Sequence, residues 1–443
     1  MERSAWQDRG VRTYSTEMNK IKKAFSAEKI RSGSFLENSS SILLTRMSFS
    51  CSSLLVIILI ARKLGPDQLG LFSVVMGFCT IFQLICALGY DTIVIRDIAK
   101  DQNKGAQLIQ HGVVLGLCSS LICALLMGVF AKALNYSPAV MRSIGISSIV
   151  LYPCFLNLLA ETVFIGIKKS KFAFYTAIVR EASWFGLSIW ALSISADINL
   201  IIESFIGSRI IGVVLFVFFL KDQQIHWLKG SYWLGLKQMI NLIPTFLLIN
   251  VLSNLLLELD VIILSKFVPL ADVGFYNVTK KILRVSFILI FSMVMAWFPT
   301  IVEAVHKNRG QVRSYFRGFS VRMSIVSISI AVSICIAADP IVHLFLGAAF
   351  MPSVKFIHIL IWKIVPLSLS FLWSRFLIAA HQQNKDALAL IFGLLLFLVL
   401  SIAFIKRWGT IGMAYADVLT LTCLAGIHLY LVDRTVFRVG GNV

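Results

Sequence analysis

Long apolar runs separated by short polar connections dominate the sequence. Twelve runs of about 20 residues are each long enough to cross a bilayer as a helix. They lie near residues 42–61, 69–90, 109–131, 143–166, 172–195, 199–220, 239–265, 273–299, 318–338, 356–380, 386–405 and 410–432. Hydrophobic residues make up 58% of the chain and charged residues 14%, against about a quarter in soluble domains. The pattern predicts an all-α polytopic membrane protein of mean hydropathy +0.84.

The basic residues are divided unevenly between the two sides of the membrane. Lysine and arginine number 24 in the connections on the side of the N-terminus and 8 on the opposite side. The positive-inside rule therefore predicts that both termini lie in the cytoplasm. The net charge of +19 follows the loops rather than one soluble segment, so we expect no nucleic-acid partner.

The stretch of residues 61–72 joins the first two spans by a very short turn. Gly65 suits the end of one helix, Pro66 suits the start of the next, and Gly70 follows one turn later. We interpret this stretch as an outer hinge, in which Arg62 and Lys63 are surface charges that flank a gate.

A second hinge with Pro269 recurs at residues 266–276, and Gly274 then takes the place of Gly70. When Gly274 is aligned with Gly70, Arg62 is paired with Lys266 and Phe72 with Tyr276. Residues 164–171 also resemble 377–385. These likenesses predict an internal parallel repeat of two six-helix lobes that can rock about a central cavity.

The repeat divides the chain into five parts. We expect a basic cytoplasmic tail over 1–41, an N-lobe over 42–220, a cytoplasmic linker over 221–238, a C-lobe over 239–432 and a cytoplasmic tail over 433–443. The first tail is either an amphipathic segment on the inner leaflet or a solvated segment that sets topology.

Charged residues inside spans are the candidates for function, because they are costly in lipid. The candidate cavity cations are Arg46, Arg180, Arg209, Lys280, Lys281, Arg284, Lys363 and Arg375. The candidate polar lining is Asn250, Asn254 and Asn277, spaced along spans seven and eight. Two alternatives stay open: Arg46 and Arg375 snorkel to the interface, and Glu181 or Glu203 neutralises deeper arginines as structural ion pairs.

Metal, cofactor and catalytic patterns are missing from the sequence. All eight cysteines fall within predicted spans without a Cys-x-x-Cys pair, and the seven histidines lack zinc-ligand spacing. No paired-carboxylate, Ser-His-Asp or phosphate-cradling glycine pattern is evident. We therefore expect a protein that is not an enzyme and needs no metal or cofactor.

Five short segments, in this order and spacing, resemble the Wzx-type polysaccharide flippases, which belong to the MATE/MOP flippase superfamily. They are Ala61-Arg-Lys-Leu-Gly-Pro with Gly70, Arg96-Asp-Ile-Ala99, Pro299, Leu346-Gly-Ala-Ala-Phe-Met-Pro-Ser353 and Trp408-Gly-Thr-Ile-Gly-Met-Ala414. The resemblance covers about residues 40 to 435.

The resemblance implies a function. Wzx-type proteins move an undecaprenyl-diphosphate-linked oligosaccharide repeat unit to the outer leaflet for O-antigen, capsule or exopolysaccharide synthesis. It implies that the cations above contact the diphosphate, that membrane lipid surrounds a monomer, and that a polysaccharide polymerase and chain-length machinery are partners.

Two further readings compete with this one. A cation-coupled MATE-type drug exporter needs acidic rather than basic cavity residues. A glycosyltransferase or polymerase on the same substrate needs a sizeable outer loop, yet no outer connection exceeds about twenty residues. Glu258 and Asp260 are either proton or sodium coupling sites or a solvated outer helix end.

Overall fold

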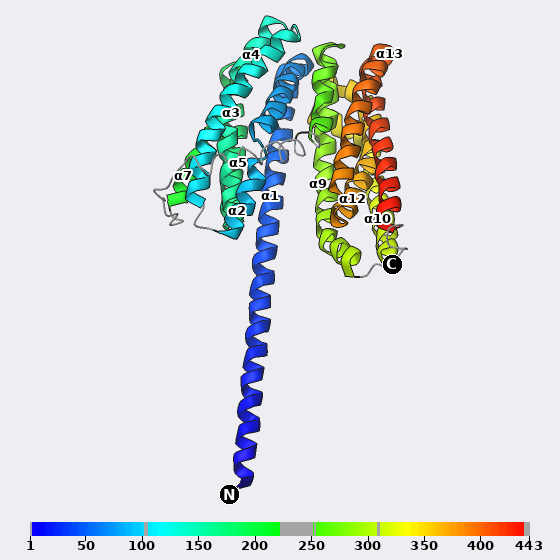
Figure 1. The fold of residues 1–443 in the computed structure, drawn as a ribbon. Helices are drawn as coiled ribbons and strands as arrows, with labels where there is room; N and C mark the ends of the chain where they lie inside the picture. Colours follow the sequence, from blue (N-terminus) through cyan, green and yellow to red (C-terminus); the bar gives the residue numbers. More distant parts are fainter. Residues whose placement is uncertain (1, 102–104, 222–250, 252–253, 308–310, 438–443) are drawn as a thin grey trace.

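The structure is a computed structural model that describes residues 2–101, 105–221, 251, 254–307 and 311–437. The described chain is built from helices that form two side-by-side groups (Figure 1). The first group contains α1 (Glu2–Cys86), α2 (Tyr90–Lys100), α3 (Gly105–Ala133), α4 (Pro138–Ser148), α5 (Leu151–Gly166), α6 (Ser170–Ile194) and α7 (Ile198–Lys221). The second contains α9 (Leu270–Lys307), α10 (Val312–Phe345), η3 (Ala348–Ser353), α11 (Val354–Leu360), η4 (Ile361–Lys363), α12 (Ile364–Ala379), α13 (Gln383–Val432) and η5 (Asp433–Phe437). Residues 254–264 are also helical.

The predicted membrane spans correspond closely to these helices. Among the described residues, eight helices are long and apolar enough to cross a membrane, and two of them each contain two predicted spans. Those eight therefore account for ten of the twelve predictions. Helix α6 matches the span near 172–195 but carries Arg180 and Glu181, which lower its hydropathy. The span near 239–265 lies partly outside the described residues. The chain is thus an all-α polytopic membrane protein.

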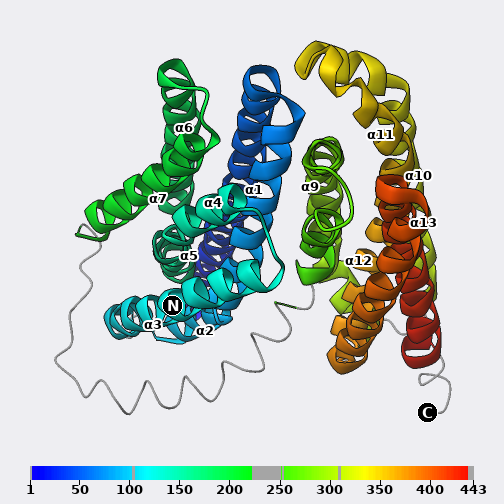
Figure 2. The ribbon, with the colours of Figure 1, turned by 90° about the horizontal axis from the view of Figure 1, so that it is seen from above.

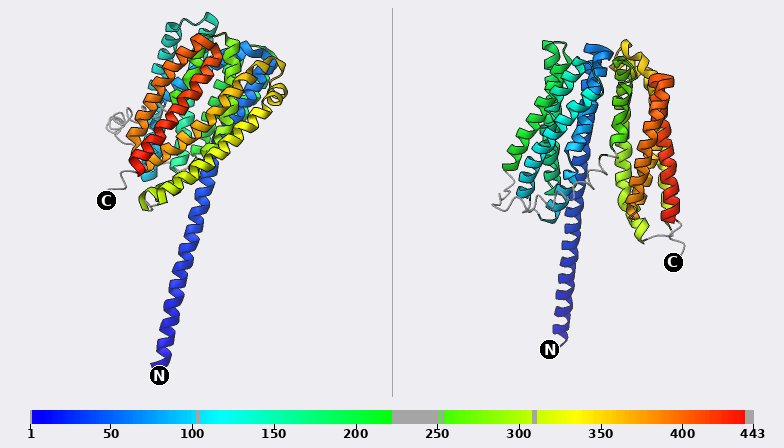
Figure 3. Two further views of the ribbon diagram at one scale, coloured as in Figure 1. Left: turned by 90° about the vertical axis from the view of Figure 1, so that its right-hand side faces the viewer. Right: turned by 45° about the horizontal axis from the view of Figure 1, so that its top comes forward.

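The ends of the predicted domains differ in detail from the helices. The basic segment 1–41 continues as helix from Glu2 into the first span, and it projects beyond the bundle (Figure 3). The segment 433–443 is helical as far as Phe437, and its last six residues lie outside the described part. Residues 222–238, nearly the whole expected linker, also lie outside it.

Two glycines break long helices into pairs of spans. Gly65 has φ 79° within α1, and Gly409 has φ 57° within α13. Glycine takes such dihedrals without a steric cost. Each kink sends the chain back across the bundle, so the start of α1 and the end of α13 lie at the same end (Figure 1).

The two predicted hinges pack directly against each other. They lie on α1 and at the start of α9, the two helices that face each other where the two groups meet (Figure 2). A Cβ atom on Gly70 would lie 1.8 Å from the carbonyl oxygen of Leu270. A Cβ atom on Gly274 would lie 2.5 Å from the carbonyl oxygen of Pro66. Position 270 is 204 residues after 66, and 274 is 204 residues after 70, so the two contacts are reciprocal. Glycine at both positions lets the helices approach to backbone contact.

The second repeated segment also has the same conformation in both lobes. Lys168 follows α5 with φ 61°, and His381 follows α12 with φ 57°. The amide of the next residue then bonds back across the turn, from Lys169 to the Phe164 carbonyl and from Gln382 to the Leu377 carbonyl, each at 2.8 Å. Residues other than glycine seldom adopt the left-handed conformation at the end of a helix. Their recurrence supports the repeat.

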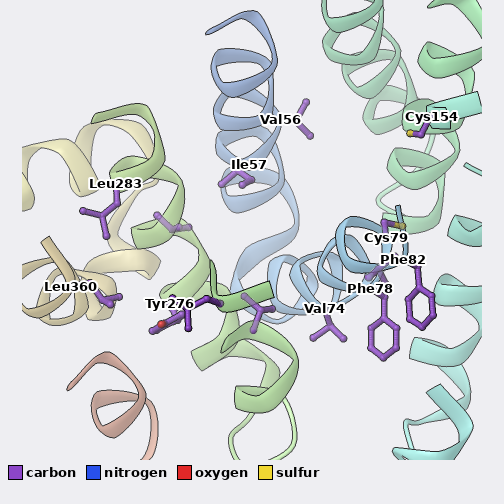
Figure 4. Packing of buried hydrophobic residues seen from close by; sticks show 14 of the residues in the cluster. Val56, Ile57, Val74, Phe78, Cys79, Phe82, Cys154, Tyr276, Leu283 and Leu360 are labelled. Atoms are coloured by element: carbon purple, nitrogen blue, oxygen red, sulfur yellow. The ribbon is translucent and has the colours of Figure 1, made fainter. Parts of the chain in front are cut away.

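Apolar side chains fill each lobe and also cover its outside. Val56, Ile57 and Phe78 of α1 and Tyr276 of α9 are buried inside the molecule (Figure 4). By contrast, leucines of α3 such as Leu125 are exposed. Exposed leucines on a long apolar helix fit contact with lipid tails.

Substitution of Gly70 tests the hinge contact. Gly70→Leu cannot fit beside the Leu270 backbone, so we expect the hinge ends of α1 and α9 to move apart by several ångströms. Spin labels at positions 63 and 267, in a background without native cysteines, measure this distance. Gly186→Leu is the matched control, because nothing lies within 4 Å of a Cβ atom there. An unchanged distance in Gly70→Leu contradicts the contact.

Candidate functional site

The first charged cluster lies inside the N-lobe, where Arg180, Glu181, Arg209 and Asn157 meet from α5, α6 and α7. Arg209 donates two hydrogen bonds to Glu181, Nη1 to Oε1 at 2.5 Å and Nη2 to Oε2 at 3.0 Å. Arg180 donates from Nε to the same Oε1 at 2.9 Å and from Nη1 to the Asn157 amide oxygen at 3.3 Å. Arg209 also lies over the Phe205 ring, 4.3 Å from its centroid. We call this group the N-lobe cluster.

The N-lobe cluster has the features of a structural ion network. Glu181 is 2% exposed, Arg209 3% and Arg180 8%, so all three charges are removed from solvent. Because these residues bond to one another, the structure favours the reading of Glu181 as their counterion. Adjacent residues of a helix point in different directions, but the long Arg180 side chain bends back to Glu181. Glu203, the other expected counterion, is exposed.

The second charged cluster lies inside the C-lobe. Lys280 donates to Asp260 at 2.6 Å, and Lys363 donates to Asp417 at 2.5 Å. The Tyr276 hydroxyl lies between the two carboxylates, 3.1 Å from Asp260 and 3.4 Å from Asp417. This C-lobe network ties α9, η4 and α13 to the helix over 254–264. Asp260 is 2% exposed, so it is not part of a solvated helix end.

A third set of cations lies where the lobes face each other, nearer the end that holds the termini. Arg46 of α1 sits over the Phe291 ring of α9, with 5.0 Å between the guanidinium carbon and the centroid. Arg375 of α12 sits over Phe371 at 4.5 Å, and the two rings stack at 5.3 Å. The two arginines therefore flank a pair of stacked phenylalanines, an arrangement stabilised by cation–π attraction.

Two further cations on α9 complete this set. Arg284 pairs with Glu258 and keeps 38% of its side chain exposed. Lys281 is partly buried, and no carboxylate lies within 4 Å of it among the residues that the structure describes. We call Arg46, Lys281, Arg284 and Arg375 the inter-lobe cations. Glu161 of α5 lies in electrostatic range of Arg46.

The asparagines predicted to line the site take different places. Asn277 donates to the Ser73 hydroxyl at 2.6 Å, which is a contact between lobes beside the two hinges. Asn254 is partly buried on the helix over 254–264. Asn250 lies outside the described residues.

One polar cluster was missed in the sequence. Ser370 bonds to His428 Nδ1 at 2.7 Å, and His428 Nε2 lies 3.1 Å from Asp386. The three residue types are those of a hydrolase triad, but His428 is 1% exposed and leaves no room for a substrate. They tie α12 to both halves of α13. Spacing could not reveal them, because 370, 386 and 428 come together only when α13 folds back at Gly409.

The three clusters differ in what they can bind. In the N-lobe cluster and the C-lobe network every cation touches a carboxylate, so little charge is left for a ligand. Of the four inter-lobe cations, only Arg284 contacts a carboxylate among the described residues, and that carboxylate is Glu258. Arginine can bind phosphate oxygens in a bidentate way. Within the described ranges, no group of three His, Cys, Asp or Glu residues is placed to hold a metal ion. The inter-lobe cations are therefore the candidate site for an anionic ligand.

Removal of the Glu181 charge tests the structural role of the N-lobe cluster. Glu181→Gln leaves two buried arginines without a counterion, a change that costs about 3–5 kcal/mol in comparable pairs. We expect a large fall in melting temperature of the detergent-solubilised protein. Glu203→Gln, at an exposed carboxylate, is the control and should leave the melting temperature unchanged. Equal melting temperatures in both variants contradict the assignment.

Solved structures of the same architecture are transporters and a flippase. A multidrug resistance MATE family transporter of the MOP superfamily in its inward-facing conformation has a TM-score of 0.75 and 14% identity, over 91% of this chain and 100% of its own. A MATE family transporter in the outward-facing conformation has a TM-score of 0.65 and 12% identity, over 92% and 96%. The lipid II flippase MurJ in an inward closed conformation has a TM-score of 0.70 and 15% identity, over 90% and 87%. At these identities the likeness shows the fold.

The sequence itself matches a family. No curated protein matches the chain. One family model, described as Polysaccharide biosynthesis protein, matches residues 35–305, which is more than half of the chain. Together with the two-lobe helical fold, this match shows that the chain belongs to the Polysaccharide biosynthesis protein family.

Proposed function

We propose that this protein is a flippase that moves an undecaprenyl-diphosphate-linked oligosaccharide repeat unit across the bacterial inner membrane by alternating access. The translocated repeat unit serves O-antigen, capsule or exopolysaccharide synthesis. Polysaccharide polymerase and chain-length machinery act on it after translocation. The polysaccharide biosynthesis family and the likeness to the lipid II flippase support this proposal.

The inter-lobe cations are the observation that carries the proposal. A lipid-linked diphosphate needs positive charge in a shielded place and an apolar path for its tail. Arg46 and Arg375 offer guanidinium groups against phenylalanine rings, and Lys281 adds an amine that no carboxylate contacts among the described residues. Such a surface suits an anionic head group attached to an apolar chain.

The arrangement of the lobes supports alternating access. The hinges are in backbone contact at the end of the bundle opposite the termini. With both termini in the cytoplasm, as the distribution of lysine and arginine favours, the hinge end is the outer one. The molecule then corresponds to an inward-facing state.

Glu258 and Asp260 remain the proposed residues for coupling to an ion gradient. Each already contacts a cation, since Glu258 pairs with Arg284 and Asp260 with Lys280. A proton or sodium ion at either carboxylate would therefore weaken an existing ion pair and release a charged side chain of α9. That release would link ion binding to movement of α9 against α1.

A MATE-type drug exporter is the second candidate, favoured by the fold. Exporters of cationic drugs need carboxylates that face the drug. The described carboxylates at this interface are few, and Glu258 is already paired. The charge at the interface thus favours an anionic cargo.

Reconstitution discriminates the two functions. In proteoliposomes we expect the protein to move undecaprenyl-diphosphate-linked oligosaccharide between leaflets, measured by the access of a sugar-binding protein to the outer leaflet. Imposed pH, sodium and voltage gradients in the same assay measure coupling, and Asp260→Asn should abolish any response. Drug resistance of an exporter-deficient strain expressing the protein, without lipid movement in liposomes, contradicts the flippase.

Variants at the inter-lobe cations test the site. Arg46→Ala and Lys281→Ala each remove a basic group that would contact the diphosphate. We therefore expect the rate of lipid-linked oligosaccharide movement in proteoliposomes to fall by about ten- to a hundredfold. The amount of protein in the membrane should not change. Arg142→Ala is the control, because Arg142 is exposed outside the interface. Normal surface polysaccharide in both variants contradicts the site.

A further inference from the structure

Arg62 reaches from the N-lobe to the end of a C-lobe helix. It lies in the last turn of α1 before the Gly65 kink and is exposed. Its Nε donates to the carbonyl oxygen of Phe345 at 2.8 Å, and its Nη2 donates to the carbonyl oxygen of Leu344. Both carbonyls belong to the final turn of α10.

Lys266 makes the converse contact from the C-lobe to the N-lobe. Its Nζ donates to the carbonyl oxygen of Leu134, just after the end of α3. The same Nζ lies 3.4 Å from the centroid of the Tyr136 ring. The Tyr136 hydroxyl in turn bonds to the Ser265 hydroxyl at 2.7 Å.

These two contacts are equivalent under the internal repeat. Position 266 is 204 residues after 62, the same offset that relates Gly274 to Gly70. Helices α3 and α10 are the third spans of their lobes. Each hinge therefore places one cation on the end of the third span of the opposite lobe.

The physics of helix ends explains why a cation sits there. The last carbonyls of a helix lack partners within the helix and carry partial negative charge. A lysine or arginine at this position satisfies them and stabilises the helix end. Here both cations come from the other lobe, so both contacts exist while the hinge ends of the lobes touch and are lost when they separate.

We propose that Arg62 and Lys266 form a reciprocal lock that holds the hinge end of the transporter shut. This inference rests on the alternating access of the proposed function. It assigns to the hinge cations a role in the balance between the two states, separate from substrate binding. Lys63 is the matched control, because this exposed neighbour donates no hydrogen bond within the part of the chain described.

Labelling of a buried interface residue tests the lock. Ser73 is 2% exposed and accepts a hydrogen bond from Asn277 of the other lobe, so a cysteine there is shielded while the hinge end is closed. Purified protein carrying Ser73→Cys is placed in lipid nanodiscs without substrate. The rate of reaction with a soluble maleimide is measured, and the rate for protein without Ser73→Cys is subtracted. We expect Arg62→Ala with Lys266→Ala to raise this rate about tenfold.

The controls separate the lock from general damage. Lys63→Ala should leave the rate unchanged, and Arg62→Lys with Lys266→Arg, which keeps both charges, should restore most of the shielding. Size-exclusion chromatography and melting temperature show whether the double alanine variant is folded. An unchanged labelling rate in the folded double variant, or an equal rise in Lys63→Ala, overturns the lock. Because no lipid-linked sugar is present, failure of the lock leaves the flippase proposal standing, and absence of flipping leaves the lock standing.

Discussion

The close approach of two helices at Gly70 and Gly274 is the contact on which the architecture depends. A side chain at either position would collide with the backbone of the opposite lobe. Since the same four positions, 66, 70, 270 and 274, supply both halves of the contact, the two lobes meet through equivalent surfaces.

Charge is distributed in a way that follows from the cost of burying ions. Inside each lobe the cations are bonded to carboxylates, as in the Arg209 and Glu181 pair and the Lys363 and Asp417 pair. Where the lobes face each other, Lys281 and Arg375 have no such partner among the described side chains. A charge without a partner is tolerable in a membrane protein where it faces water or an anionic ligand. The interface between the lobes is thus the place where a ligand adds most to the electrostatic energy.

Part of the site could be read from the sequence, and part could not. The deep cations were recognised because charge within an apolar run is rare, and Arg46, Lys281 and Arg375 remain at the interface. Arg180 and Arg209 were placed in the same set but belong to the N-lobe cluster. Their position depends on how α6 and α7 rotate about their axes, and the apolar runs around them do not record that rotation.

The sequence by itself determined the membrane class, nearly all of the spans, both hinges and the repeat. Each of these rests on local features: the length of an apolar run, a glycine before a proline, and the spacing of like motifs. The tertiary structure alone decided which charges neutralise each other and that Arg62 and Lys266 cross to the opposite lobe. The Arg62 and Lys266 contacts join residues 283 and 132 positions apart, and ion pairs such as that of Lys363 with Asp417 join different helices. Both kinds of contact depend on the packing of helices rather than on any local pattern.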